Sequence, residues 1–123
     1  MKKRKLKGFF VGVNGEYGVR ECADELQAFY DLLNCSYIEC PVRVFKGKRL
    51  VVICDEEGTL KSDAKLSGVA TDKGRYEFLV GNLFVVGSDG ENFRSLDSEE
   101  IGAVASCLVY GPGEGRNILV YKH

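Results

Sequence analysis

The sequence predicts an α+β domain: an antiparallel or mixed sheet of about five to seven strands with two helices. Several short runs rich in valine, isoleucine, tyrosine and phenylalanine are separated by glycine-containing turns, which is typical of strands. Two other segments carry apolar residues at helical spacing. A chain of 123 residues with 45% hydrophobic content can form one buried core. We therefore expect a single domain over residues 1–123, with residues 1–7 as a flexible basic arm.

The first predicted element is a hairpin. The segment GFFVGVNGEYGVRE contains two short apolar runs on either side of Asn14-Gly15. This dipeptide accepts the positive φ angles of a type I′ turn, so it is a strong hairpin signal. The basic residues before Gly8 then precede the first strand, as a solvated terminus.

The first predicted helix is DELQAFYDLLN, in which Asp24 and Gln27 fit a capping box and Asn34 suits the end. Its apolar residues lie at i, i+3, i+4 and i+7 and should pack on one face of the sheet. They are Leu26, Phe29, Tyr30 and Leu33.

The second predicted helix is SLDSEEIGAVASCLVY, where Asp97 and Glu100 fit a capping box. Its predicted buried stripe consists of Ile101, Val104, Ala105 and Leu108.

The remaining strands are predicted from composition. SYIECPVRVF and RLVVICDEEG are joined by a tight turn at residues 46–48, and Pro41 indicates a bulge or an edge. Residues 59–74 are polar and weakly periodic, which favours a surface loop. RYEFLVGNLFVVG is strand-like with a bend at Gly81-Asn82, and RNILVYK is the last strand.

The cysteines argue against a metal or redox centre. The chain has five cysteines at scattered positions. An odd number is not typical of a secreted disulfide scaffold, and the close cysteine pairs of a zinc site are absent from the sequence. We expect reduced thiols and no cofactor, with a structural zinc held by scattered cysteines and His123 as the alternative. His123 is the single histidine and the last residue of the sequence, which disfavours a histidine-based catalytic set. We therefore expect no enzymatic activity.

No stretch approaches the roughly 20 apolar residues that cross a bilayer. The basic start leads only into FFVGV, which is too short for a signal peptide. We expect a cytoplasmic protein of the host cell without a membrane partner.

Charge is segregated along the chain, although the net charge is only −1. Such patches steer partners toward a surface. One candidate protein-binding set comprises the acidic corners and an aromatic residue beside them: Asp55, Glu56, Glu57, Glu91, Phe93, Glu99 and Glu100. The alternative is a nucleic-acid grip on the hairpin tip RVFKGKR, assisted by the basic arm, in which cations would track phosphates and phenylalanine would stack a base. It comprises Arg43, Phe45, Lys46, Lys48 and Arg49.

Two further motifs admit a site or a simple turn. DEEG after an apolar run could hold a divalent cation, but a solvated turn is favoured. GPGEGR offers glycines and an arginine for a phosphate, yet it leads into a strand and lacks the Walker pattern. A small-nucleotide sponge built on GPGEGR therefore stays an alternative.

Three blocks carry a resemblance: DELQAFYDLLNCSYIEC, VVICDEEGTL and FLVGNLFVVG. They are similar to the successive blocks of a family of unknown function found in phages and conjugative elements, over about residues 20–87. The family often has a proline and an asparagine shortly after the acidic turn, and KSDAKLSGVATDKG has neither. The resemblance implies a mobile-element protein, and similar families resemble anti-CRISPR proteins, which block RNA-guided nucleases.

We therefore expect a non-enzymatic phage or mobile-element protein that binds and inhibits a host defence protein, such as an RNA-guided nuclease. The alternatives are a nucleic-acid-binding accessory protein and the small-nucleotide sponge. The sequence does not indicate the oligomeric state.

Overall fold

The computed structural model describes residues 4–122, except the side chain of Asp72. The elements, in chain order, are β1 (Lys5–Val11), β2 (Tyr17–Ala23), α1 (Leu26–Leu33), β3 (Ile38–Glu39), β4 (Val42–Phe45), β5 (Lys48–Asp55), the 3₁₀ turn η1 (Gly58–Leu60), β6 (Leu66–Asp72), β7 (Arg75–Val80), β8 (Leu83–Ser88), β9 (Phe93–Arg94), α2 (Ser98–Ala105), β10 (Leu108–Gly111) and β11 (Arg116–Lys122).

The predicted fold class is wrong in its balance of elements. The described chain is mostly sheet, with 11 strands in one mixed sheet and two helices, instead of five to seven strands. Strand β6 lies inside the segment predicted as a loop, and β10 begins inside the predicted second helix. Strands β3 and β9 are only two residues long, too short for a periodic pattern.

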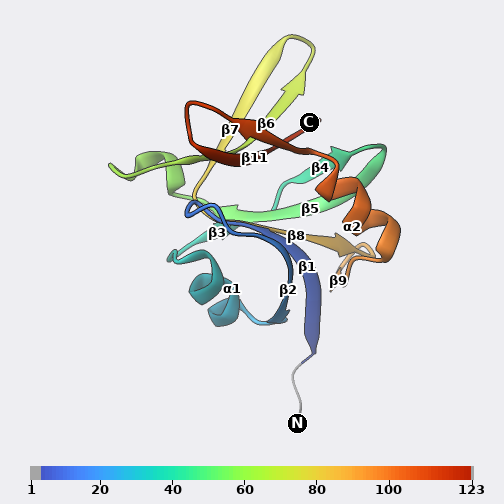
Figure 1. The fold of residues 1–123 in the computed structure, drawn as a ribbon. Helices are drawn as coiled ribbons and strands as arrows, with labels where there is room; N and C mark the ends of the chain where they lie inside the picture. The colour runs from blue at the N-terminus through green and yellow to red at the C-terminus, as the bar shows by residue number, and fades with distance from the viewer. Residues whose placement is uncertain (1–3, 123) are drawn as a thin grey trace.

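The main path of the sheet is β2-β1-β8-β5-β4-β11-β6-β7, with β10 on β11, β3 on β5 and β9 on β8. Strands β11 and β6 pair in parallel, whereas the other described pairs are antiparallel. The sheet is strongly curled (Figure 1), and Arg43 of β4 bonds to Glu77 of β7 across its concave side. Hairpin β6–β7 projects beyond the rest of the molecule (Figure 1).

Each side of the sheet has its own core, and a different helix covers it. On the inner side, Val104 of α2 packs on a cluster that includes Phe45, Leu119 and Tyr121. On the outer side, Phe29 and Leu33 of α1 pack on a second cluster, which consists of Leu6, Phe10, Cys22, Val51, Ile53, Phe84 and Val86. The two helices accordingly lie on different sides of the central strands (Figure 1).

The hairpin turns differ from the prediction in detail. The β1–β2 hairpin forms as predicted, but its connection spans residues 12–16, and only Gly15 of the Asn14-Gly15 pair has a positive φ, at 94°. In contrast, both residues of Lys46-Gly47 have positive φ angles, which a type I′ turn requires. Residues 5–7 of the predicted basic arm belong to β1, and residues 1–3 lie outside the described residues.

The helix ends test the capping predictions. The predicted Asp24–Gln27 capping box is wrong, because α1 starts after Glu25 without a side-chain cap and Gln27 bonds to Asp31 instead. Asn34 ends the helix in a left-handed conformation, as predicted. In α2 the predicted capping box between Asp97 and Glu100 is confirmed.

Gly102 offers a matched test of the local backbone. It lies inside α2, and an added Cβ would meet no atom within 4 Å. We expect Gly102→Ala to raise the free energy of unfolding by about 0.5–1 kcal/mol, because alanine loses less backbone entropy on forming a helix. Gly47→Ala should lower it by about 1 kcal/mol, because Gly47 has equal space but a φ of +83°. Urea titration of both variants measures the change in the free energy of unfolding. A change of the same sign in both variants would contradict this explanation.

Neither helix in the described part of the chain has the length and apolar run needed to span a bilayer.

Candidate functional site

Neither described helix covers the outer side of the strands beyond β5, toward β4, β11, β6 and β7. Strand registers put alternate residues of β4, β6, β7, β10 and β11, together with the start of β5, on this side, because paired residues in neighbouring strands point to the same face. We call this surface the open face. It consists of Val42, Val44, Arg49, Val69, Thr71, Tyr76, Phe78, Val109, Val120 and Lys122.

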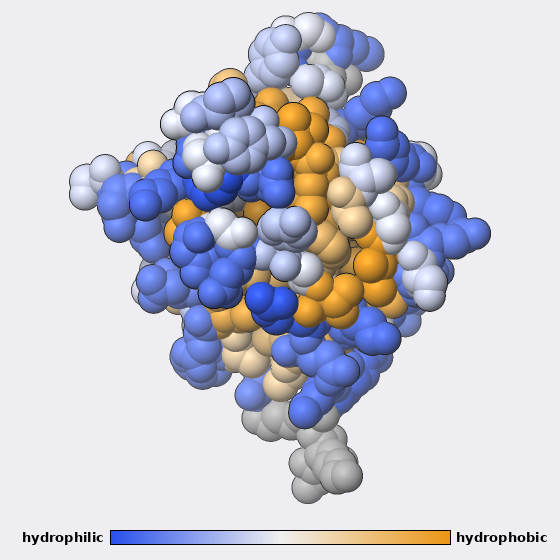
Figure 2. Space-filling view, viewed as in Figure 1, coloured by the Kyte–Doolittle hydropathy of each residue, from blue (hydrophilic) through white to orange (hydrophobic). Residues whose placement is uncertain are grey.

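Apolar side chains dominate the open face. In the view of Figure 2, hydrophobic residues form a band that runs downward from below the projecting hairpin and is bordered by hydrophilic groups. Val42, Val109 and Val120 are exposed, whereas α1 shields the equivalent valines and isoleucine on the central strands. Contiguous exposed apolar surface of this kind commonly marks an interaction site.

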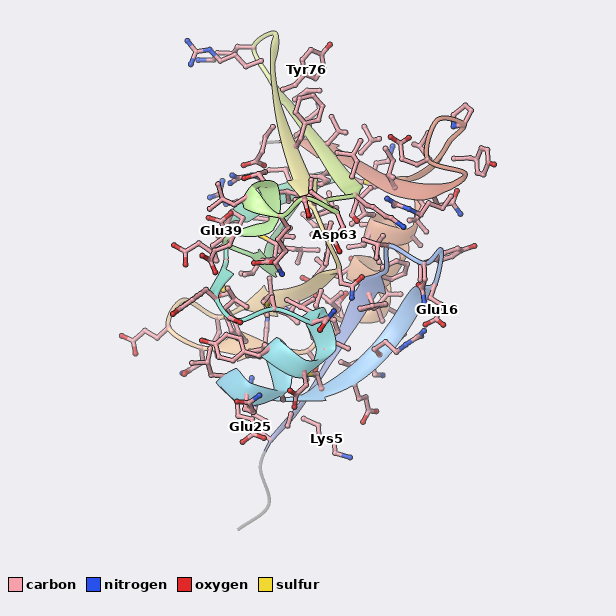
Figure 3. The ribbon with its side chains drawn as sticks, turned by 90° about the vertical axis from the view of Figure 1, so that its left-hand side faces the viewer. Lys5, Glu16, Glu25, Glu39, Asp63 and Tyr76 are labelled. Carbon is pink, nitrogen blue, oxygen red and sulfur yellow. The ribbon has the colours of Figure 1, made fainter. Side chains whose placement is uncertain are left out.

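Two aromatic side chains stand out at the edge of this face. Tyr76 is 66% exposed and Phe78 is 57% exposed. Their rings lie 6.4 Å apart between centroids with an interplanar angle of 20°. Figure 3 shows Tyr76 on the projecting hairpin, pointing away from it into solvent. The pair contributes nothing to either buried core.

A salt bridge holds the aromatic strand in place from the inner side. The Arg43 guanidinium donates two hydrogen bonds to the Glu77 carboxylate, with Nε–Oε2 at 2.8 Å and Nη2–Oε1 at 2.5 Å. The bond to Glu77 raises the pKa of Arg43. Because Glu77 is anchored inward, strand alternation points Tyr76 and Phe78 outward. The open face is thus preorganised, which lowers the entropic cost of docking.

A groove adjoins the open face between the β4–β5 turn and β11. Its volume is about 380 Å³. The lining combines apolar side chains with two lysines: Val44, Lys46, Gly47, Thr71, Cys107, Val120, Tyr121 and Lys122. A groove of this size can receive a side chain from a docked partner.

The charges on the open face have one sign. Arg49 and Lys122 are both exposed, and the ten residues that define the face include no acid. A partner with a weakly acidic rim around an apolar centre would complement this pattern.

The predicted acidic protein-binding set does not form one surface. Asp55 is buried and its Oδ2 lies 2.6 Å from Lys61 Nζ. Glu100 is buried and forms a bidentate pair with Arg94 at 2.7 Å. The two groups lie at opposite ends of the β5–β8 pair, because Ile53 pairs with Phe84 whereas β9 joins β8 at Gly87.

The other members of that set are scattered around these ends. Glu56 and Glu91 are exposed, and Glu57 is half-buried. Glu99 is exposed and pairs with Lys48 at 3.0 Å. Phe93 is half-buried, with its ring edge on Phe29 at 5.8 Å, so core packing accounts for it.

The residues predicted to grip nucleic acid lie together on the β4–β5 hairpin, but three of the five are buried or paired within the fold. Phe45 is fully buried and stacks on Tyr121, so it is not available to a base. Arg43 is paired with Glu77, and Lys48 is paired with Glu99. Lys46 and Arg49 remain exposed.

The thiols are free, and three of them are buried: Cys22, Cys54 and Cys107. Burial raises the pKa of Cys54 strongly, which disfavours the reactive thiolate. Within residues 4–122, no group of three or more histidine, cysteine, aspartate or glutamate side chains is arranged to hold a metal ion. His123, the histidine of the zinc alternative, lies outside the described residues.

The sequence prediction missed Tyr76 and Phe78 as candidate site residues. They lie in RYEFLVGNLFVVG, which is predicted as strand-like without an assignment of its two faces. The signal was the alternation in RYEFLV, where the aromatic residues alternate with Arg75, Glu77 and Leu79. Period-two alternation predicts two different faces, one of which can be open.

Comparison with known proteins leaves the function open. No curated protein and no solved structure matches the chain. One family model, a domain of unknown function (DUF3846), matches residues 7–108, which include most of the sheet and both helices. The chain therefore belongs to the DUF3846 family of domains of unknown function.

Proposed function

We propose that this protein is a non-enzymatic inhibitor that binds a host protein through the open face. The observation that carries this proposal is the uncovered apolar surface around Tyr76 and Phe78. The centres of protein–protein interfaces are apolar, poor in acids and rich in aromatic side chains and arginine. The composition of the open face agrees with that description.

A protein partner is favoured over nucleic acid by the aliphatic content of this surface. Nucleic-acid platforms combine aromatic side chains with many cations that follow the phosphates. The open face has five valines and only two cations, Arg49 and Lys122. The nucleic-acid alternative requires an exposed Phe45 to stack on a base, but Phe45 is fully buried.

The resemblance of three blocks of this chain to a family found in phages and conjugative elements supports a narrower proposal. We infer that the partner belongs to a host defence system and that the protein acts as an anti-CRISPR-like inhibitor of an RNA-guided nuclease. Binding alone suffices for such inhibition, because an occupied surface can block a conformational change or a substrate channel. The paired carboxylates and buried thiols of this chain are consistent with a role that needs no catalysis.

The test uses Phe78→Asp, which places a charge at the centre of the aromatic pair. Cells that carry an RNA-guided nuclease and a targeted plasmid should keep the plasmid when the wild-type protein is expressed. Phe78→Asp should abolish this protection and weaken binding to the purified nuclease about thirty-fold, since an aromatic hot spot contributes about 2 kcal/mol.

Tyr37→Asp is the matched control, because Tyr37 is an exposed aromatic residue outside the open face. It should protect the plasmid as well as the wild type does. Thermal unfolding of both variants verifies that they fold. The proposal fails if folded wild-type protein gives no protection, or if both variants lose protection equally. If binding to the purified RNA-guided nuclease disappears once nucleic acid in the sample has been digested, the result would instead indicate nucleic-acid binding.

A further inference from the structure

Arg116, the first residue of β11, is a largely buried cation that forms no ion pair with a described residue. The residue is only 9% exposed. Its Nη1 atom is inaccessible to solvent and has no hydrogen-bond partner in the described chain. The other buried charged residues differ, because Asp55 is paired with Lys61 and Glu100 with Arg94.

Such an arrangement is energetically costly. A guanidinium keeps its proton at any physiological pH, so it cannot escape burial by becoming neutral. A guanidinium N–H that is buried without an acceptor loses its hydrogen bonds to water and gains none in return, which is unfavourable. The other two buried groups without partners, on Ser67 and Tyr121, are neutral hydroxyls and are less costly. Among the described residues, Arg116 is therefore the buried charged group for which an anionic ligand would supply the absent counter-charge.

Arg116 lines a pocket of about 340 Å³. Three segments that are distant in sequence form it: the β1–β2 turn with Val13, residues 64–66 before and at the start of β6, and the β10–β11 loop with Gly113 and Glu114. Figure 3 looks onto this side of the molecule, where Glu16 of the β1–β2 turn and Asp63 of the loop before β6 are labelled. The volume falls in the range of small-molecule sites.

The pocket has a net positive lining. Lys65 supplies a second cation, and Glu114 supplies one carboxylate. Glu114 forms no described ion pair with Arg116. The remaining lining residues, Val13, Ala64, Leu66 and Gly113, carry no charge. The net formal charge of the lining residues is therefore +1, from Arg116, Lys65 and Glu114, which complements a small anion.

We propose that this pocket binds a small oxyanion ligand, a phosphate- or carboxylate-bearing molecule, with Arg116 as the anchor and Lys65 as a second contact. A planar guanidinium can donate two parallel hydrogen bonds to either group, and such charge-assisted bonds are among the strongest in proteins. The site lies at the glycine-rich GPGEGR segment. It is separate from Tyr76 and Phe78, so it goes beyond the proposed docking function.

The test titrates the purified protein with inorganic phosphate, adenosine 5′-monophosphate and succinate. Isothermal titration calorimetry and thermal unfolding are compared with chloride at equal ionic strength. At least one probe should bind and raise the melting temperature, because a ligand of the folded state stabilises it. Arg116→Gln should weaken binding at least tenfold. Binding of the phosphates alone, of succinate alone or of all three supports the site and identifies the oxyanion that it prefers.

Two further variants keep the test informative if Arg116→Gln folds poorly. Glu114→Gln retains Arg116 and removes the opposing carboxylate, so it should bind the anion several-fold more tightly. Arg49→Gln removes an exposed cation elsewhere and should bind like the wild type. Arg116→Met should melt at or above the wild-type temperature in chloride, since an apolar side chain replaces an unpaired charge. It should show no shift with the probes.

The inference is overturned if none of the probes shifts the wild type beyond chloride, or if Arg116→Gln binds as tightly as the wild type. It is tested without any partner protein. Phe78→Asp should therefore bind the anion normally even where plasmid protection is lost.

Discussion

Replacing Phe45 with alanine should lower the free energy of unfolding by about 3–5 kcal/mol, the range for removing a large buried aromatic ring. Phe45 is fully buried on the inner side of β4. Its ring stacks on Tyr121 with centroids 4.8 Å apart and an interplanar angle of 27°. Because β4 meets β11 in register only at Val44 and Lys122, this stack is a major part of the contact between the two strands.

Phe78→Ala is the control for this substitution, since it removes the same ring from an exposed position. Its effect should stay within about 1 kcal/mol, as for most surface substitutions. Urea denaturation followed by far-UV circular dichroism measures both values. Equal losses for the two variants would show that the open face is part of the folding core, and both the burial argument and the docking proposal would then fail.

Acidification should destabilise the protein through Glu100. Its carboxylate accepts two hydrogen bonds from Arg94 and one from the Asp97 backbone N–H. The bond to Arg94 is the main cause that lowers the pKa of Glu100 from 4.5 to about 2, against the opposing effect of burial. The folded state thus prefers the ionised carboxylate. The resulting stability is complete above pH 4.5 and is lost as the pH falls toward 2.

Glu100→Gln isolates this contribution. At pH 7 the variant should lose about 2–3 kcal/mol, the scale that the pKa difference implies when the half-exposed position of Arg94 is considered. The difference from the wild type should narrow between pH 4.5 and pH 2. Glu99→Gln is the matched control, because the Glu99 carboxylate is next to Glu100 in sequence but is exposed and pairs with the partly exposed Lys48. It should lose much less stability than Glu100→Gln does. A difference that is independent of pH would refute the assignment.

Elements defined by local chemistry could be predicted. The α2 start depends on Asp97 and Glu100, which lie three residues apart and cap the same turn. The end of α1 at Asn34 and the tight turn at Lys46-Gly47 depend on backbone preferences of one or two residues. These features need no distant partner, so the pattern of neighbouring residues is sufficient.

Elements defined by distant partners were mispredicted. Strand β6 is polar and contains Gly68, and it is a strand because β11 and β7 pair with it on both sides. Leu108 fits a helical stripe, but β10 pairs it with Leu119. Such hydrogen bonds join residues that are distant along the chain, and single-sequence periodicity contains no information about them.

For the candidate sites, too, some features follow from the sequence alone and others only from the tertiary structure. The sequence alone establishes the strand-rich composition, the two helices and the segregation of charge along the chain. The curled sheet determines that Phe45 is buried, that Arg43 and Glu77 pair, that Tyr76 and Phe78 face solvent and that Arg116 lacks a counter-charge. Exposure and pairing are properties of contacts between distant segments. They therefore arise only when the strands assemble.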